Sequence, residues 1–239
     1  MAAINQVVDL SKDGEIAVVT VNSPPVNALS ADVRDGLAGA FAAIAADSGV
    51  KAAVLVCAGR TFIAGADISE FGKPPRGAQL PAVQDAMESA PVPVIAAIHG
   101  TALGGGLEVA LCAHYRVSDA KAKFGLPEVK LGLLPGAGGT QRLPRIVGAK
   151  KATEMVTSGA QMGAKDALAT GLVDEVVDGD LTAGAIAFAR RVVAEKRPLK
   201  KVRDDASKLG GDAASLAPFF AEFRAKNAKT FKGFDAPEA

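Results

Sequence analysis

Three glycines followed closely by one glutamate form the part of this sequence best suited to chemistry. The stretch ALGGGLEVAL covers residues 102–111, and Glu108 is its only charged residue. Glycine lets a ligand approach the main chain closely, and N–H groups at the start of a following helix favour an anion. A carboxylate in so apolar a segment is costly unless it is protonated or lies in a polar pocket. The alternative is that Glu108 faces solvent beside Arg116 or Lys121.

A second glycine-bearing turn, CAGRTFIAGADI, follows the apolar run AAVLV at residues 52–56. Within it, Gly65 and Ala66 could offer main-chain N–H groups. Turns at the carboxyl ends of parallel strands can face one crevice. Two N–H donors directed at one oxygen form an oxyanion hole, which stabilises negative charge as it develops in a reaction. The two turns together therefore favour chemistry at a carbonyl group.

A third stretch, FGLPEVKLGLLPGAGGTQRLPRIVG, contains a second candidate acid. Glu128 follows Pro127 in what could be the first turn of a short helix, where a solvated acid is also common. The run LLPGAGG indicates a tight turn. Other motifs are excluded, because the sequence lacks residues that they require. These motifs are the phosphate-binding loop, the dinucleotide fingerprint and the serine nucleophile elbow. His99 and His114 have no metal-ligand spacing, so we expect structural roles and no metal site.

The composition indicates a globular protein with a sizeable core. The chain has 239 residues, 49% of them hydrophobic, and a net charge of +1. Basic residues are spread along the chain, so we expect no nucleic-acid partner. No apolar run approaches the roughly 18 residues that span a bilayer, and no secretory signal pattern begins the chain. Cys57 and Cys112 lie in apolar surroundings, as expected of buried thiols. The composition, the absence of a long apolar run and the two cysteines together favour a soluble protein of the cytoplasm.

Hydrophobic patterns predict strands that alternate with helices, which is typical of an α/β layered domain. Ser30 can cap a helix whose apolar stripe runs through Val33, Leu37, Phe41 and Ile44. Continuous apolar runs predict strands covered on both faces. We expect strands at 16–21, 52–56, 94–98, 115–118 and 173–177, further helices at 150–158, 164–170, 182–196 and 215–231, and a surface loop at 72–81.

Taken in order, AGADI, ALGGGLE, GLPEVKLG and PGAGGTQRLPR resemble the crotonase superfamily, the enoyl-CoA hydratase/isomerase family. The resemblance spans residues 10–235, and residues 114–148 are especially similar to the N-terminal hydratase/isomerase domain of multifunctional β-oxidation enzymes. It implies an α/β crotonase-like fold of stacked ββα units with C-terminal helices. Residues 1–195 would form the crotonase core and residues 196–239 a C-terminal helical segment. We expect that segment to be truncated, leaving Phe219, Phe220 and Phe223 exposed.

The resemblance also implies roles for individual residues. Glu108 and Glu128 match the two catalytic glutamates, and the N–H groups of Ala66 and Gly105 match the oxyanion hole. The segment around AGADI matches the part that lies along coenzyme A, so the candidate substrate-binding residues are Ala64, Gly65, Asp67, Ile68 and Gly104. Coenzyme A would be part of the substrate, and no separate cofactor is implied.

Retention of both acids favours an enoyl-CoA hydratase of fatty-acid β-oxidation. We expect Glu108 to orient and activate water and Glu128 to deliver the proton, with the two acids titrating as a pair. One alternative is a Δ3,Δ2-enoyl-CoA isomerase that works through Glu128, and another is a fragment that binds CoA thioesters with little turnover. Expected partners are the acyl-CoA substrate and further copies of the chain in a trimer or hexamer, or a 3-hydroxyacyl-CoA dehydrogenase fused in a longer chain.

Overall fold

Five segments form the parallel part of a seven-stranded sheet. The structure is a computed structural model and describes residues 2–237. The parallel strands, in spatial order, are β3 (Ile16–Val21), β4 (Ala52–Cys57), β5 (Val94–Ile98), β7 (Tyr115–Ser118) and β10 (Glu175–Val176). At the β3 edge the antiparallel strands β2 (Val8–Asp13) and β1 (Ala2–Ala3) complete the sheet. All five predicted strands are present, although β10 is shorter than expected.

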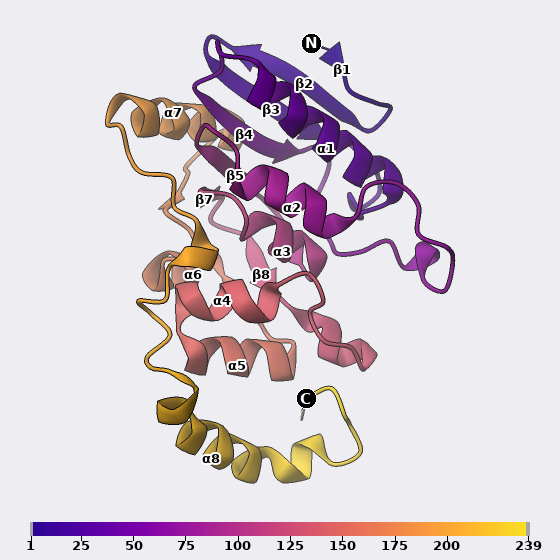
Figure 1. Ribbon diagram of the computed structural model, residues 1–239, viewed down its shortest axis with the longest axis vertical. Coiled ribbons are helices and arrows are strands. Elements are labelled where there is room, and N and C mark those ends of the chain that lie inside the picture. Colours follow the sequence, from indigo (N-terminus) through magenta and orange to yellow (C-terminus); the bar gives the residue numbers. More distant parts are fainter. Residues whose placement is uncertain (1, 238–239) are drawn as a thin grey trace.

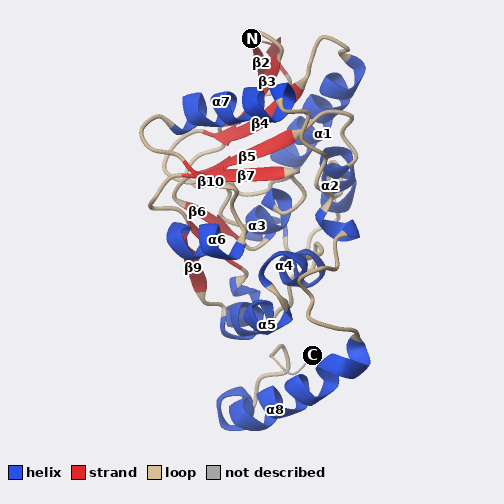
Figure 2. Ribbon diagram, turned by 90° about the vertical axis from the view of Figure 1, so that its left-hand side faces the viewer, coloured by secondary structure: helices blue, strands red, loops and turns tan. Residues whose placement is uncertain are grey.

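Helices cover both faces of this sheet, which explains why β4 and β5 are apolar throughout. Helix α7 (Leu181–Ala194) packs on one face, and α1 (Ala31–Ala46) packs on the other (Figure 2). Helix α1 begins as predicted, because the Ser30 side chain accepts a hydrogen bond from the Val33 amide. The apolar stripe of α1 is buried against the sheet.

Short elements on the α1 side of the sheet include the helix expected after the three glycines and the helix predicted at 164–170, together with elements that the sequence did not indicate. Helix α2 (Leu80–Glu88) lies beside α1, and α3 (Gly105–Ala110) follows on the far side of α2 (Figure 1). A second sheet is built from three-residue strands and is followed by α6. Its strands are β6 (Thr101–Leu103), β8 (Lys123–Gly125) and β9 (Gln161–Gly163), and α6 spans Ala164–Thr170.

The remaining helices lie progressively further from the main sheet. Helices α4 (Gly139–Val147) and α5 (Ala149–Ser158) are adjacent, and α8 (Ala213–Phe231) lies at the end of the molecule opposite to β1 (Figure 1). Within residues 2–237, three short 3-10 helices complete the fold: η1 (Ile68–Glu70), η2 (Pro127–Leu131) and η3 (Val202–Asp204).

The aromatic cluster on α8 corrects one expectation. Phe219, Phe220 and Phe223 are half-buried and not exposed. The Phe219 ring lies 5.1 Å from Phe220 and 5.9 Å from Phe223, centroid to centroid. Phe220 and Phe223 also line a hollow shared with α4 and α5. The rings therefore cover one another and turn part of their surface toward the body of the protein.

Burial of the two thiols agrees with their apolar surroundings in the sequence. Cys57 and Cys112 are both free and buried. Burial raises the pKa of the Cys112 thiol to about 12, and it raises that of Cys57 as well. Within residues 2–237, none of the helices combines the length and apolar character that crossing a membrane requires.

Candidate active site

The candidate site is a cavity of about 390 Å³ at the carboxyl ends of β4 and β5. The turn after β4 and the segment after β5 meet there, as the two glycine-bearing motifs suggested. The cavity is lined by nearly all the residues singled out in the sequence: Ala64, Gly65, Ala66, Ile68, Gly104, Gly105, Glu108 and Glu128. Asp67 does not line it. Its side chain accepts a hydrogen bond from the Ser69 amide and borders a separate hollow.

Two main-chain amides lie close together in this cavity. A Cβ atom placed on Gly105 would lie 3.8 Å from the Ala66 nitrogen. The approach depends on Gly106, where a Cβ would lie 2.0 Å from the Ile63 carbonyl oxygen. Among residues 2–237, neither the Ala66 nor the Gly105 N–H donates a hydrogen bond, so both can serve a ligand.

The Ala66 turn is held from outside by the segment before α1. The Leu29 amide donates to the Gly65 carbonyl at 2.9 Å, which fixes one side of the Gly65–Ala66 peptide. Arg34, on α1, donates to the Leu29 carbonyl at 2.6 Å and forms a 2.9 Å ion pair with Glu70. The turn is therefore braced on both sides of Ala66.

Glu108 is buried, so the solvent-facing alternative is wrong. The residue is 3% exposed, and Arg116 is itself buried. One carboxylate oxygen, Oε1, accepts hydrogen bonds from the Ala137 and Gly139 amides, both at 2.8 Å. Burial raises the pKa of the Glu108 carboxyl, and these two amides oppose that rise. The sequence indicated a tight turn at LLPGAGG. It could not show that main-chain amides of this turn bind Glu108, because every residue except proline has such an amide.

Glu128 lies in η2 on the other side of the cavity. Its Oε1 atom would lie 3.1 Å from a Cβ on Gly104. Its Oε2 atom is buried and has no hydrogen-bond partner among the described residues. Burial, assisted by the neighbouring charge of Glu108, raises the pKa of the Glu128 carboxyl to about 7. A carboxyl group in this state can either donate or accept a proton near neutral pH.

Apolar side chains surround the mouth of the cavity. Ile68 and Phe71 lie on one side, at η1, and Leu131, Leu133 and Leu134 lie at and after η2. Ile68 is 72% exposed and Leu131 is 69% exposed. Exposed apolar side chains gathered at a cavity mouth are typical of a binding site for an apolar ligand.

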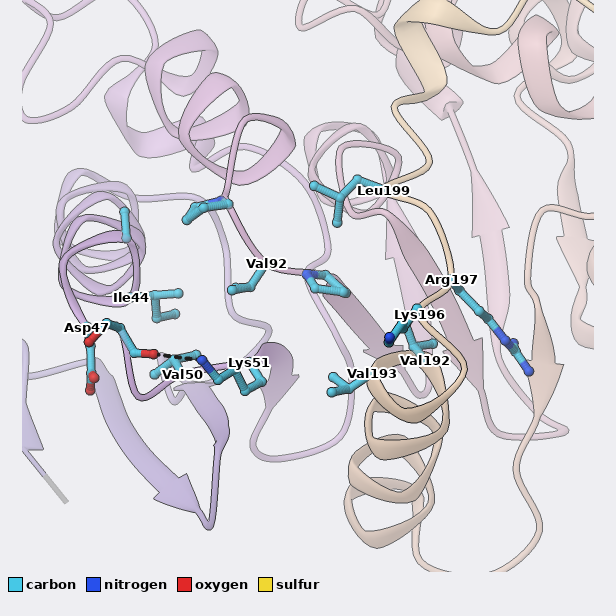
Figure 3. A pocket seen from close by; sticks show the side chains of 14 residues that line it. Ile44, Asp47, Val50, Lys51, Val92, Val192, Val193, Lys196, Arg197 and Leu199 are labelled. Atoms are coloured by element: carbon cyan, nitrogen blue, oxygen red, sulfur yellow. Dashed lines mark hydrogen bonds between the residues drawn. The ribbon is translucent and has the colours of Figure 1, made fainter.

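A larger hollow of about 590 Å³ lies at the opposite edge of the sheet, where β4 and β5 begin (Figure 3). Two of its three cationic residues have local partners. Lys51 donates to the Ser48 carbonyl at 3.0 Å, and Arg197 pairs with Glu195 at 2.6 Å. Asp47 is the one acid among its lining residues. This hollow lacks the paired acids that equip the smaller cavity for chemistry.

The two histidines have structural surroundings, as expected from the sequence. His114 is fully buried, and its Nδ1 atom accepts a hydrogen bond from the Val94 amide. Burial lowers the pKa of the His114 imidazole to about 4. The His99 Nε2 atom lies 3.1 Å from the Gly59 carbonyl oxygen. The described residues include no group of three or more His, Cys, Asp or Glu side chains that could hold a metal ion.

Comparison with known families and proteins gives one consistent result. Residues 11–209 match the family described as enoyl-CoA hydratase/isomerase. The chain is 45% identical over 188 residues to a peroxisomal bifunctional enzyme of Danio rerio, covering 79% of this chain and 26% of that protein. It is also 45% identical over 176 residues to a probable enoyl-CoA hydratase of Bacillus subtilis (strain 168), covering 70% of this chain and 67% of that protein.

Solved structures agree with the sequence comparisons. A crystal structure from Magnetospirillum magneticum, described as an enoyl-CoA hydratase/carnithine racemase, is 34% identical with a TM-score of 0.74. That alignment covers 93% of this chain and 94% of the other. The bifunctional relative is much longer, since this chain spans about a quarter of its length.

Proposed function

This chain belongs to the enoyl-CoA hydratase/isomerase family, and we propose that it hydrates trans-2-enoyl-CoA to 3-hydroxyacyl-CoA in fatty-acid β-oxidation. The observation that carries the proposal is that two free amides, the buried acid Glu108 and the half-buried acid Glu128 line one cavity. A single-acid reaction has no use for Glu108, whereas hydration needs two proton-handling groups.

The amides of Ala66 and Gly105 bind the thioester oxygen of the substrate. As water adds at C3, electrons move toward that oxygen and the thioester takes on enolate character. The two N–H groups stabilise this charge more strongly in the transition state than in the bound substrate. One such donor typically contributes about 2.7–4 kcal/mol of transition-state stabilisation.

The two glutamates divide the proton transfers. Glu108 is held by two amides through Oε1, and those bonds favour its ionised form. It uses Oε2 to take a proton from the attacking water. Glu128, whose pKa is raised to about 7, delivers a proton to C2. The O–H bond of water breaks, C–O and C–H bonds form across C2 and C3, and one proton passes between the acids before the next turnover.

The rest of the substrate binds along the cavity mouth. Coenzyme A lies against Ala64, Gly65, Ile68 and Gly104, and the acyl chain contacts the apolar side chains around η1 and η2. Coenzyme A is carried by the substrate and is not a separate cofactor. In relatives of the bifunctional type this region is one part of a longer protein, and we extend the hydration step alone to this chain.

Isomerisation of 3-enoyl-CoA is the second candidate. It needs one carboxyl group to move a proton between C2 and C4. The unpartnered Oε2 atom of Glu128 favours it as that group. Under this alternative, Glu108→Ala abolishes hydration and spares isomerisation.

An absorbance assay tests the proposal. The protein is mixed with trans-2-enoyl-CoA thioesters of increasing chain length, and loss of the ultraviolet absorbance of the conjugated thioester is followed. We expect loss of absorbance with formation of 3-hydroxyacyl-CoA, identified by mass spectrometry. The doubly substituted control Glu108→Gln/Glu128→Gln should give a flat trace. A flat trace from the unsubstituted protein, with binding of the thioester intact, would instead identify a CoA-thioester binder.

A further inference from the structure

Helix α2 buries two polar side chains one helical turn apart. Gln84 is 3% exposed and Glu88 is 1% exposed, on a helix whose other buried residues are Val83 and Met87. Burying polar groups is unfavourable unless they are hydrogen-bonded. Neither residue lines the cavity that holds the acids. Their partners should therefore show what these two side chains do.

Both side chains bind the segment that leads into α4. Gln84 Nε2 donates to the Ala137 carbonyl oxygen at 2.8 Å. Glu88 Oε2 lies 2.9 Å from Arg142 Nη2, in an ion pair that is almost fully buried. Arg203 lies beside the same carboxylate, with 3.4 Å between Nε and Oε2. Helix α2 thus holds the Ala137 loop at one point and α4 at another.

The same segment holds Glu108. The Ala137 N–H donates to Glu108 Oε1, while the Ala137 carbonyl accepts the bond from Gln84. Glycines flank Ala137 on both sides, and Gly138 has φ +89°. Glycine gives the backbone little stiffness of its own. The orientation of the Ala137 amide therefore depends on bonds from outside the loop, and Gln84 makes such a bond.

We propose that Gln84 is a positioning residue for hydration, which acts by holding the Ala137 and Gly139 amides on Glu108 Oε1. With Oε1 occupied by both amides, Oε2 stays directed at the cavity for the attacking water. This inference rests on the proposed role of Glu108 in activating water. Gln84 is neutral, so its hydrogen bond can be removed without leaving a buried charge. Removing Glu88 or Arg142 would instead leave the other member of their ion pair buried without a partner.

Gln84→Met tests the inference, because methionine keeps the length of the side chain and loses the amide donor. The matched control is Met87→Leu, an apolar change of similar volume on the same buried face of α2. Two quantities are measured for each protein: the pH profile of kcat and KM for hydration, and the pKa of Glu108 by carbon-13 NMR of the unliganded protein. Melting temperatures show whether either variant is unfolded under these conditions.

We expect Gln84→Met to lower kcat by roughly 10- to 100-fold with KM nearly unchanged. The hydrogen bonds from the Ala137 and Gly139 amides favour ionised Glu108, so weakening them raises the pKa of the Glu108 carboxyl. The acidic limb of the kcat profile then moves to higher pH. Met87→Leu should change neither quantity. A wild-type Glu108 pKa and pH profile in Gln84→Met would overturn the inference, and so would an equal change in Met87→Leu. Full hydration by Glu108→Gln would instead refute the proposed function itself.

Discussion

The Glu108 carboxylate accepts a 2.8 Å hydrogen bond from the amide of Gly139, a residue 31 positions further along the chain. That contact joins the acid on α3 to the first residue of α4. It leaves no room for a side chain at position 139, because a Cβ there would lie 3.0 Å from Glu108 Oε1 and 2.9 Å from a Leu126 methyl carbon. The glycine is therefore part of how the acid is held.

Substitution Gly139→Ala should displace the Glu108 carboxylate. We predict a fall in hydration kcat of roughly 10- to 100-fold, because small displacements of a reacting group have large effects on rate. Steady-state kinetics measure the change. The control is Gly163→Ala, where a Cβ meets no heavy atom within 4 Å. Equal rates for the two variants would show that the contact at position 139 does not matter for the reaction.

Substitution Gly106→Ala should separate the two free amides. The added Cβ would lie 2.0 Å from the Ile63 carbonyl oxygen, and main-chain atoms cannot rotate away. We predict destabilisation of roughly 1–3 kcal/mol or more, as for other overpacked sites, together with loss of hydration. Urea unfolding measures the free energy, again beside Gly163→Ala. An unchanged unfolding midpoint would contradict the close contact between these two turns.

The pH dependence of hydration should follow the ionisation of Glu128. Its carboxyl group must be protonated to deliver a proton to C2, and its pKa is raised to about 7. We therefore predict that kcat/KM declines as the pH rises through about 7, since this parameter reports on the free enzyme. Rates measured across a series of buffers test this, and a constant kcat/KM well into the alkaline range would assign the proton transfer to another group.

Replacement of Glu128 should stabilise the protein in alkaline solution. A carboxyl group whose pKa is higher in the folded than in the unfolded state binds more protons when folded, so its contribution to stability falls as pH rises between the two pKa values. We predict that Glu128→Gln melts at a higher temperature than wild type at pH 8, with a smaller difference at pH 5. An exposed acid on α8, changed by Glu222→Gln, is the control. A gain that does not depend on pH would point to packing as the cause.

Much of the fold could be predicted because its main signals are local. Strands β3, β5 and β7 appear at the predicted residues. For β5 the signal is a continuous apolar run, which is typical of a strand buried on both faces. Helix α2 was missed for two reasons. It is short and follows a loop rich in proline and glycine, and its buried Gln84 and Glu88 look like a solvent face when only the sequence is considered. The second sheet was missed because strands of three residues carry too little pattern.

The parts of the site whose chemistry depends on side chains were predictable from the sequence. The parts that depend on main-chain groups were less so. Glycine-flanked acids drew attention to Glu108 and Glu128, and the structure brings both to one cavity. The amides that hold Glu108 come from Ala137 and Gly139, whose residue types do not identify them as donors. Asp67 was grouped with the substrate-binding residues because it lies in AGADI, the segment that resembles the part of the family along coenzyme A. In the structure its side chain borders a different hollow.

The most direct test of the account is the hydration kcat of the single variant Glu108→Gln, measured beside wild type with a saturating trans-2-enoyl-CoA. Glutamine keeps the shape of the side chain but cannot take a proton from water. We predict that kcat falls by about 10²- to 10⁴-fold while KM changes little. A variant that hydrates the substrate within a few-fold of the wild-type rate would contradict the central claim that two glutamates share the reaction.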